Sequence, residues 1–174
     1  MAHIHRTTMS PTKLELLDRW LPQQPWYAGS GQTDATRVGG FRLDDPAGDV
    51  GIEFMFVRDD ASDDRTTYHV PMTYRGEPVP SAEAALVGTS EHGVLGPRFI
   101  YDGAHDPVLV AQLLALLHGA VEPQHQSQSD TVDPTVRLLR VLSAGAPTAH
   151  ATGVSAPWPS PGGAEVRGPV VVID

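Results

Sequence analysis

The sequence predicts an α+β fold in which an antiparallel meander of about four strands is flanked by two helices. Three observations carry this prediction. Apolar residues recur at helical spacing near the N-terminus, the pattern then alternates with period two between turn residues, and a strongly apolar helix follows. A helix on one face of such a sheet forms a two-layer sandwich, with an additional three-stranded β segment expected at the C-terminus.

The first helix is expected to begin at Ser10 and Pro11, with Ser10 as the N-cap and Pro11 at the first helical position. Apolar residues then follow at helical spacing, at Leu14, Leu17 and Leu21. Pro22 ends the helix because proline cannot continue the backbone hydrogen bonding.

The meander is predicted from segments in which apolar residues alternate with others. These segments are Val38–Leu43, Val50–Val57, Thr66–Tyr74 and Arg98–Tyr101. In the second of them Val50, Ile52, Phe54 and Phe56 share one face. Turn residues separate the segments, and Ala84–Val87 fits either a short strand or a helical turn.

The second helix has the clearest boundaries. Asp106 is a good N-cap, Pro107 suits the first helical position, and Gly119 stands where a helix C-terminal glycine belongs. A cap of this kind contributes about 1 kcal/mol. The leucines between these ends form a wide apolar stripe, and we expect Leu113 to be a core position.

Three segments are expected in the domain organisation. Residues 1–120 form the α+β domain, residues 121–134 form a polar linker or loop rich in Gln and Ser, and residues 135–174 form a β-rich C-terminal segment. About forty residues make a marginal domain alone, so we expect the last segment to dock on the first domain or to extend its sheet.

Composition limits the function classes. The net charge is −9 with 12 basic residues, which argues against a nucleic-acid or anionic-membrane surface. No cysteine is present, so disulfides and thiolate chemistry are excluded. The chain shows no secretory leader pattern and no long apolar run, so we expect a cytoplasmic protein. Its basic residues are almost all Arg, which is typical of a high-GC bacterium.

The sequence lacks the common motifs of catalytic and nucleotide-binding sites. The sequence has no GxSxG, HExxH, GxGxxG or phosphate-loop motif. Its only lysine, Lys13, falls in the first predicted helix, where it fits no ATP site. We therefore expect no catalytic residue, no metal, no cofactor and no independent enzyme.

Four side chains are candidates for binding a small ligand: Trp26, Tyr27, Tyr101 and His105. Trp26 and Tyr27 begin a glycine-containing loop, and two interpretations remain open for them. They form either a stacking platform for a sugar or base, or an aromatic plug at the junction of helix and sheet, which we favour.

Three motifs resemble a known family. Residues 25–31 (PWYAGSG) resemble the W-[FY]-A-G-K-G-R motif of the maltokinase N-terminal cap domain. Residues 68–75 (YHVPMTYR) are similar to the family's Y-x-V-P-L-x-Y-R strand, and residues 101–107 (YDGAHDP) to its Y-D-x-x-x-D-P helix start. Residues 1–5 and 40–46 resemble a subgroup of stand-alone cap-like proteins without the kinase lobes.

The resemblance implies an antiparallel sheet with flanking helices, cystatin-like in outline. It implies a non-catalytic cap-like module that binds or regulates a partner, a sugar kinase or another enzyme of trehalose, maltose or α-glucan metabolism. The alternatives are a sugar-binding protein, or part of a sugar kinase that acts only with separate catalytic lobes. Ser30 and Gln32 replace the family's Lys and Arg, so this loop lacks the basic pair.

Overall fold

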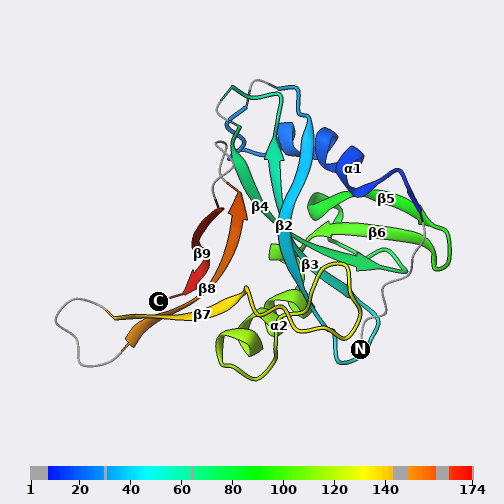
Figure 1. Ribbon diagram of the computed structural model, residues 1–174. Coiled ribbons are helices and arrows are strands. Elements are labelled where there is room, and N and C mark those ends of the chain that lie inside the picture. The colour runs from blue at the N-terminus through cyan, green and yellow to red at the C-terminus, as the bar shows by residue number, and fades with distance from the viewer. Residues whose placement is uncertain (1–7, 30, 64, 143–148, 160–164, 174) are drawn as a thin grey trace.

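The computed structural model describes residues 8–29, 31–63, 65–142, 149–159 and 165–173. The predicted α+β class is confirmed: the described residues form a six-stranded antiparallel sheet, a three-stranded sheet and two α-helices (Figure 1). Residues 1–5, which carry part of the resemblance to the stand-alone subgroup, lie outside the described residues, and so does Ser30.

The first helix, α1 (Lys13–Trp20), begins slightly later than predicted. Its N-cap is Thr12 and not Ser10, because Thr12 and Glu15 form a reciprocal capping box. The Thr12 side chain accepts from the Glu15 N–H, and the Glu15 carboxylate accepts from the Thr12 N–H at 2.7 Å. Pro22 ends the α-helix as predicted, within a short 3₁₀ turn, η1 (Leu21–Gln23).

The large sheet has the strand order β1-β5-β6-β4-β3-β2. Its strands are β1 (Met9–Ser10), β2 (Ala35–Leu43), β3 (Gly51–Asp59), β4 (Thr67–Arg75), β5 (Leu86–His92) and β6 (Gly96–Asp102). The four predicted meander segments lie in β2, β3, β4 and β6, which pair in that order, and β5 pairs on the outer side of β6. The chain reaches the outer strand first, through the 3₁₀ turn η2 (Glu83–Ala85), and the β5–β6 hairpin then returns.

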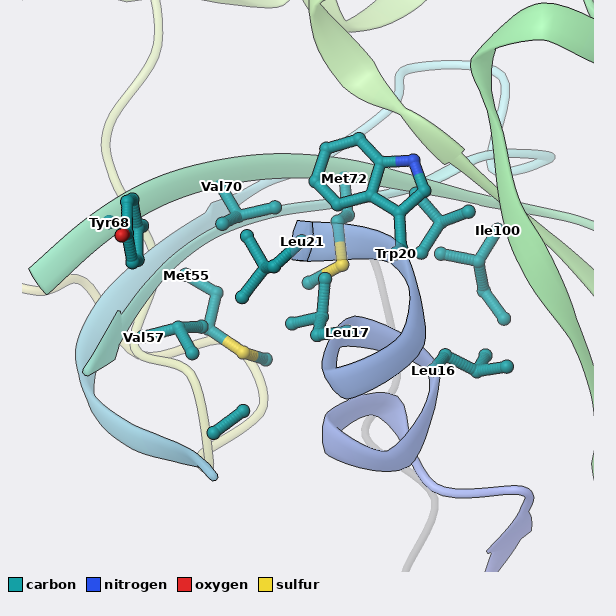
Figure 2. Close-up of a cluster of buried hydrophobic side chains, with 12 residues drawn as sticks. Leu16, Leu17, Trp20, Leu21, Met55, Val57, Tyr68, Val70, Met72 and Ile100 are labelled. Carbon is teal, nitrogen blue, oxygen red and sulfur yellow. The ribbon is translucent and has the colours of Figure 1, made fainter. Parts of the chain in front are cut away.

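Both faces of this sheet are covered, which corrects the two-layer expectation. The helix α1 packs on one face, where Leu17 and Leu21 meet Met55, Val57 and Val70 (Figure 2). The helix α2 (Pro107–Leu117) packs on the other, with buried side chains that cluster against Phe41, Ile52 and Phe54. The physical reason is the alternation of β3, which buries Ile52, Phe54 and Phe56 on one face and Met55 and Val57 on the other.

The helix α2 begins at Pro107 with Asp106 as its N-cap, as predicted. Its buried side chains are Leu109, Leu116 and Leu117, whereas Leu113 is only partly buried against the same cluster. The core position of this helix is therefore Leu109 rather than Leu113. A short 3₁₀ turn, η3 (Gly103–His105), joins β6 to α2.

The predicted three-stranded C-terminal segment is confirmed as the antiparallel sheet β7-β8-β9. Its strands are β7 (Arg137–Leu142), β8 (Ala149–Pro159) and β9 (Glu165–Ile173), and β8 contacts β2 and α2. Within residues 121–134, Gln124 forms backbone bridges with Arg42 of β2 and with Val132. These bridges hold that segment against the edge of the large sheet.

Candidate functional site

Two of the recognised motifs meet at Asp106. This carboxylate lies at the start of α2 and is 5% exposed. It accepts a bidentate pair from Arg75, with Nε to Oδ2 and Nη2 to Oδ1 both at 2.8 Å. It also accepts from the Thr73 hydroxyl at 2.8 Å and from the Val108 N–H at 2.9 Å. The motif residues of β4 are thus tied to the motif residues of α2.

Electrostatics at Asp106 favour the ionised form. Burial alone would raise the pKa of this carboxyl. Hydrogen bonds from Arg75, Thr73 and Val108, together with the charge of Arg75, outweigh that effect and lower the pKa below its usual range. Asp106 is therefore an ionised, buried cap whose accepting capacity is spent on the protein itself.

The aromatic loop forms a second cluster, beside the other end of β4. The Tyr27 hydroxyl donates to Oδ2 of the fully buried Asp59 at 2.8 Å. Burial and the hydrogen bond to Asp59 raise the pKa of Tyr27 to about 12. Trp26 is 48% exposed, and its ring packs edge-on against Trp20 with 5.7 Å between centroids. Tyr27 and Trp26 both also contact the Tyr68 ring.

A steric contact explains why residue 29 of this motif is a glycine. A β-carbon at Gly29 would overlap the ring and hydroxyl of Tyr27. The backbone N–H of Ala28 meanwhile donates to the Tyr68 hydroxyl at 3.2 Å. These contacts favour the plug interpretation of the loop, although half of the Trp26 side chain faces solvent.

The four candidate ligand residues lie in two places. Trp26 and Tyr27 pack near Tyr68, whereas Tyr101 and His105 border a cavity beside Arg75. Tyr68 and Arg75 are seven positions apart on β4, a separation of about 23 Å for an extended strand. One small ligand cannot reach both places. Tyr101 and His105 remain together, lining a cavity of about 280 Å³.

The structure shows that Glu53 is a buried, ion-paired carboxylate, which no sequence motif indicates. This carboxylate is 3% exposed and accepts from Lys13 Nζ and from the Tyr74 hydroxyl, each at 2.6 Å. Gln126 donates to its other oxygen at 3.0 Å. Burial would raise its pKa, but the charge and hydrogen bond of Lys13 and the hydrogen bond of Tyr74 lower it. The only sequence signal was a glutamate inside an otherwise apolar strand.

His69 lies on the α2 side of β4, against Phe54 and Phe56. The His69 ring stacks 5.8 Å from Phe54 and lies 5.3 Å from Phe56, measured between centroids. Its Nε2 atom is buried and has no hydrogen-bond partner among the described residues. Burial lowers the pKa of His69 to about 4, so the imidazole is neutral at physiological pH.

We expect acid to destabilise the protein through His69. Between pH 6.5 and 4 the unfolded histidine takes up a proton that the folded one does not, which costs about 3 kcal/mol in all. This stability is complete above pH 6.5 and is lost as the pH falls. His69→Phe should flatten that part of the curve, measured by urea unfolding at several pH values. Parallel curves for the two proteins would contradict the assignment.

Neither α-helix in the described part of the chain combines the length and hydrophobicity needed to cross a membrane. Across the same described ranges, no three His, Asp or Glu side chains are grouped closely enough to hold a metal ion.

Comparison with known proteins agrees with the motifs. The model of the maltokinase N-terminal cap domain family matches residues 20–106, half of the chain. This range covers the aromatic loop, β2 to β6 and the Asp106 cap. A search of curated proteins finds no significant match. The family match, together with motif residues that meet in one fold, establishes that this chain belongs to the maltokinase N-terminal cap domain family.

Proposed function

We propose that the chain acts as a non-catalytic cap module that binds and regulates a partner enzyme of trehalose, maltose or α-glucan metabolism. The observation that carries this proposal is how the motif side chains are used. Asp106, Arg75 and Tyr27 bond to other parts of the same chain. The family motifs therefore maintain a fold, and the surface of that fold is what a partner would meet.

Two ordered parts of the surface suit a protein partner. At the β5–β6 turn, Val94 and Leu95 are 61% and 45% exposed. Their backbone N–H groups both donate to Nδ1 of His92, which fixes the turn. On α2, Val110 and Leu114 are also exposed large apolar side chains. Ordered apolar side chains of this kind are common at protein interfaces.

The first experiment is a pull-down from the native host, analysed by mass spectrometry. We expect a sugar kinase or glucan enzyme in nearly equal amount to the bait. Two double variants serve as controls for each other: Val94→Ser with Leu95→Ser, and Val110→Ser with Leu114→Ser. One of them should abolish recovery of the partner enzyme, and the other should leave it unchanged. Recovery of no such enzyme, with unchanged glucan and trehalose levels after gene deletion, would refute the proposal.

A further arm tests the alternative that the chain works as part of a sugar kinase with separate catalytic lobes. Purified lobes of a recovered kinase would be assayed for maltose phosphorylation with and without the chain. A change in kcat or KM that saturates at equal concentrations supports cooperation with those lobes. Binding without any change in rate would favour a partner-binding role without control of turnover.

A further inference from the structure

A cavity of about 280 Å³ lies where the end of β4, β6, the segment around η2 and the start of α2 come together. This volume is near the lower end for small-molecule sites and suits a ligand of one ring. Much of the wall is aliphatic, formed by Val79, Ala82, Ala85 and Pro107. Polar groups converge on the remaining side, which is the arrangement that small-molecule sites share.

Tyr101 supplies a buried hydrogen-bond donor at this cavity. Its side chain is 4% exposed, and its hydroxyl oxygen accepts from the Val79 N–H at 2.9 Å. A phenol can donate as well as accept, and within the described residues the structure gives its O–H no acceptor. Because an unmade hydrogen bond of a buried group is costly, this O–H is suited to an oxygen atom of a ligand.

The charges around the cavity argue against an anionic ligand, and the Tyr101 O–H argues against an ammonium ligand, which has no lone pair to accept it. Arg75 and Asp106 both border the cavity, but their bidentate ion pair cancels their charges. Asp102 also borders it and accepts from the Ala104 N–H through Oδ1. Its Oδ2 lies 3.9 Å from Nε2 of the exposed His105, too far for a hydrogen bond. An anion would find no unspent guanidinium charge here and would be repelled by Asp102.

We propose that this cavity binds a small neutral ring alcohol. The ring lies against the aliphatic wall, the ligand oxygen accepts from Tyr101, and a ligand hydroxyl donates to Asp102. This inference stands apart from the proposed partner, since it uses a different surface from Val94, Leu95, Val110 and Leu114.

Three probes with the same ring test the ligand class: cyclohexanol, cyclohexanecarboxylate and cyclohexylammonium. Each would be titrated into the ¹⁵N-labelled full chain while backbone amide shifts are followed. We expect cyclohexanol to shift the amides of Val79, Tyr101 and Asp102, and to bind more tightly than either charged probe. Tighter binding of a charged probe would overturn the ligand class, and absence of shifts with all three would overturn the site.

Two variants with a matched control place the ligand in the cavity. Ala85→Leu fills the cavity and should abolish binding of cyclohexanol, whereas Ala84→Leu, at an exposed neighbour that does not line it, should not. Tyr101→Phe should weaken binding about three- to tenfold, the effect of one lost hydrogen bond. Thermal unfolding would verify that each variant is folded. Unchanged binding in a folded Ala85→Leu variant would overturn the proposal.

Discussion

Asp106→Ala is expected to lower the free energy of unfolding by about 3–5 kcal/mol, several times the value of an ordinary helix cap. The substitution removes the cap of α2, and it also leaves the Arg75 guanidinium and the Thr73 hydroxyl without their common acceptor. Removing one member of a buried, hydrogen-bonded ion pair is costly because the other charge stays partly desolvated. The Arg75 side chain is only 23% exposed.

Asp102→Ala is the matched control. Asp102 accepts from the Ala104 N–H at 3.0 Å at the start of η3, as a local cap does, but it lacks a bidentate arginine. We expect this variant to lose about 1 kcal/mol. Urea unfolding at neutral pH would compare the two, and equal losses would show that the Arg75 pair contributes little.

The pH dependence adds a second measurement of the same interaction. Because the folded structure lowers the pKa of Asp106, its ionised form stabilises the protein above the ordinary carboxyl pKa. This stability is lost as the pH falls through the lower folded value. The difference between wild type and Asp106→Ala should therefore shrink in acid.

The parts of the fold that depend on local pattern were predictable from the sequence. Asp106 and Pro107 fix the start of α2 through backbone chemistry within a few residues. The placement of β5 is different, because Ala84–Val87 fitted either a short strand or a helical turn, and only tertiary packing puts β5 on the outer side of β6. The second covered face was not predicted, because alternation within β3 does not show what packs on each face, and Met55 and Val57 are buried under a helix that lies far from them in the sequence.

The contacts of the site residues were harder to predict, because their hydrogen-bond partners lie far away in the sequence. Asp106 was recognised as a cap, but its strongest partner, Arg75, lies 31 positions earlier in the chain. Tyr27 and Tyr101 are candidates for ligand binding by sequence, yet each hydroxyl is engaged by a distant group, Asp59 or Val79. Long-range hydrogen bonds of this kind leave no spacing in the sequence to detect.

Lys13→Met is the second substitution with a large expected effect, and it tests the buried carboxylate Glu53. Lys13 Nζ lies 2.6 Å from Glu53 Oε2 and 4.8 Å from the centroid of the Tyr74 ring. Without this cation, a carboxylate that is 3% exposed stays buried with only neutral hydrogen-bond donors bonded to it. We expect a loss of about 3–5 kcal/mol at neutral pH, measured by urea unfolding.

The decisive comparison combines Lys13→Met with Glu53→Met. Replacing both members of a buried ion pair with apolar residues of similar size is often nearly neutral, so the double variant should recover most of the lost stability. The pH dependence of the free energy of unfolding should also differ in sign between wild type and Lys13→Met. In wild type the pKa of Glu53 is lowered, so its contribution is present at neutral pH and fades as the pH falls. In Lys13→Met burial dominates and raises that pKa, so stability should fall as the pH rises past the ordinary glutamate value. A double variant as unstable as Lys13→Met alone would place the loss in the packing of α1 rather than in the uncompensated charge.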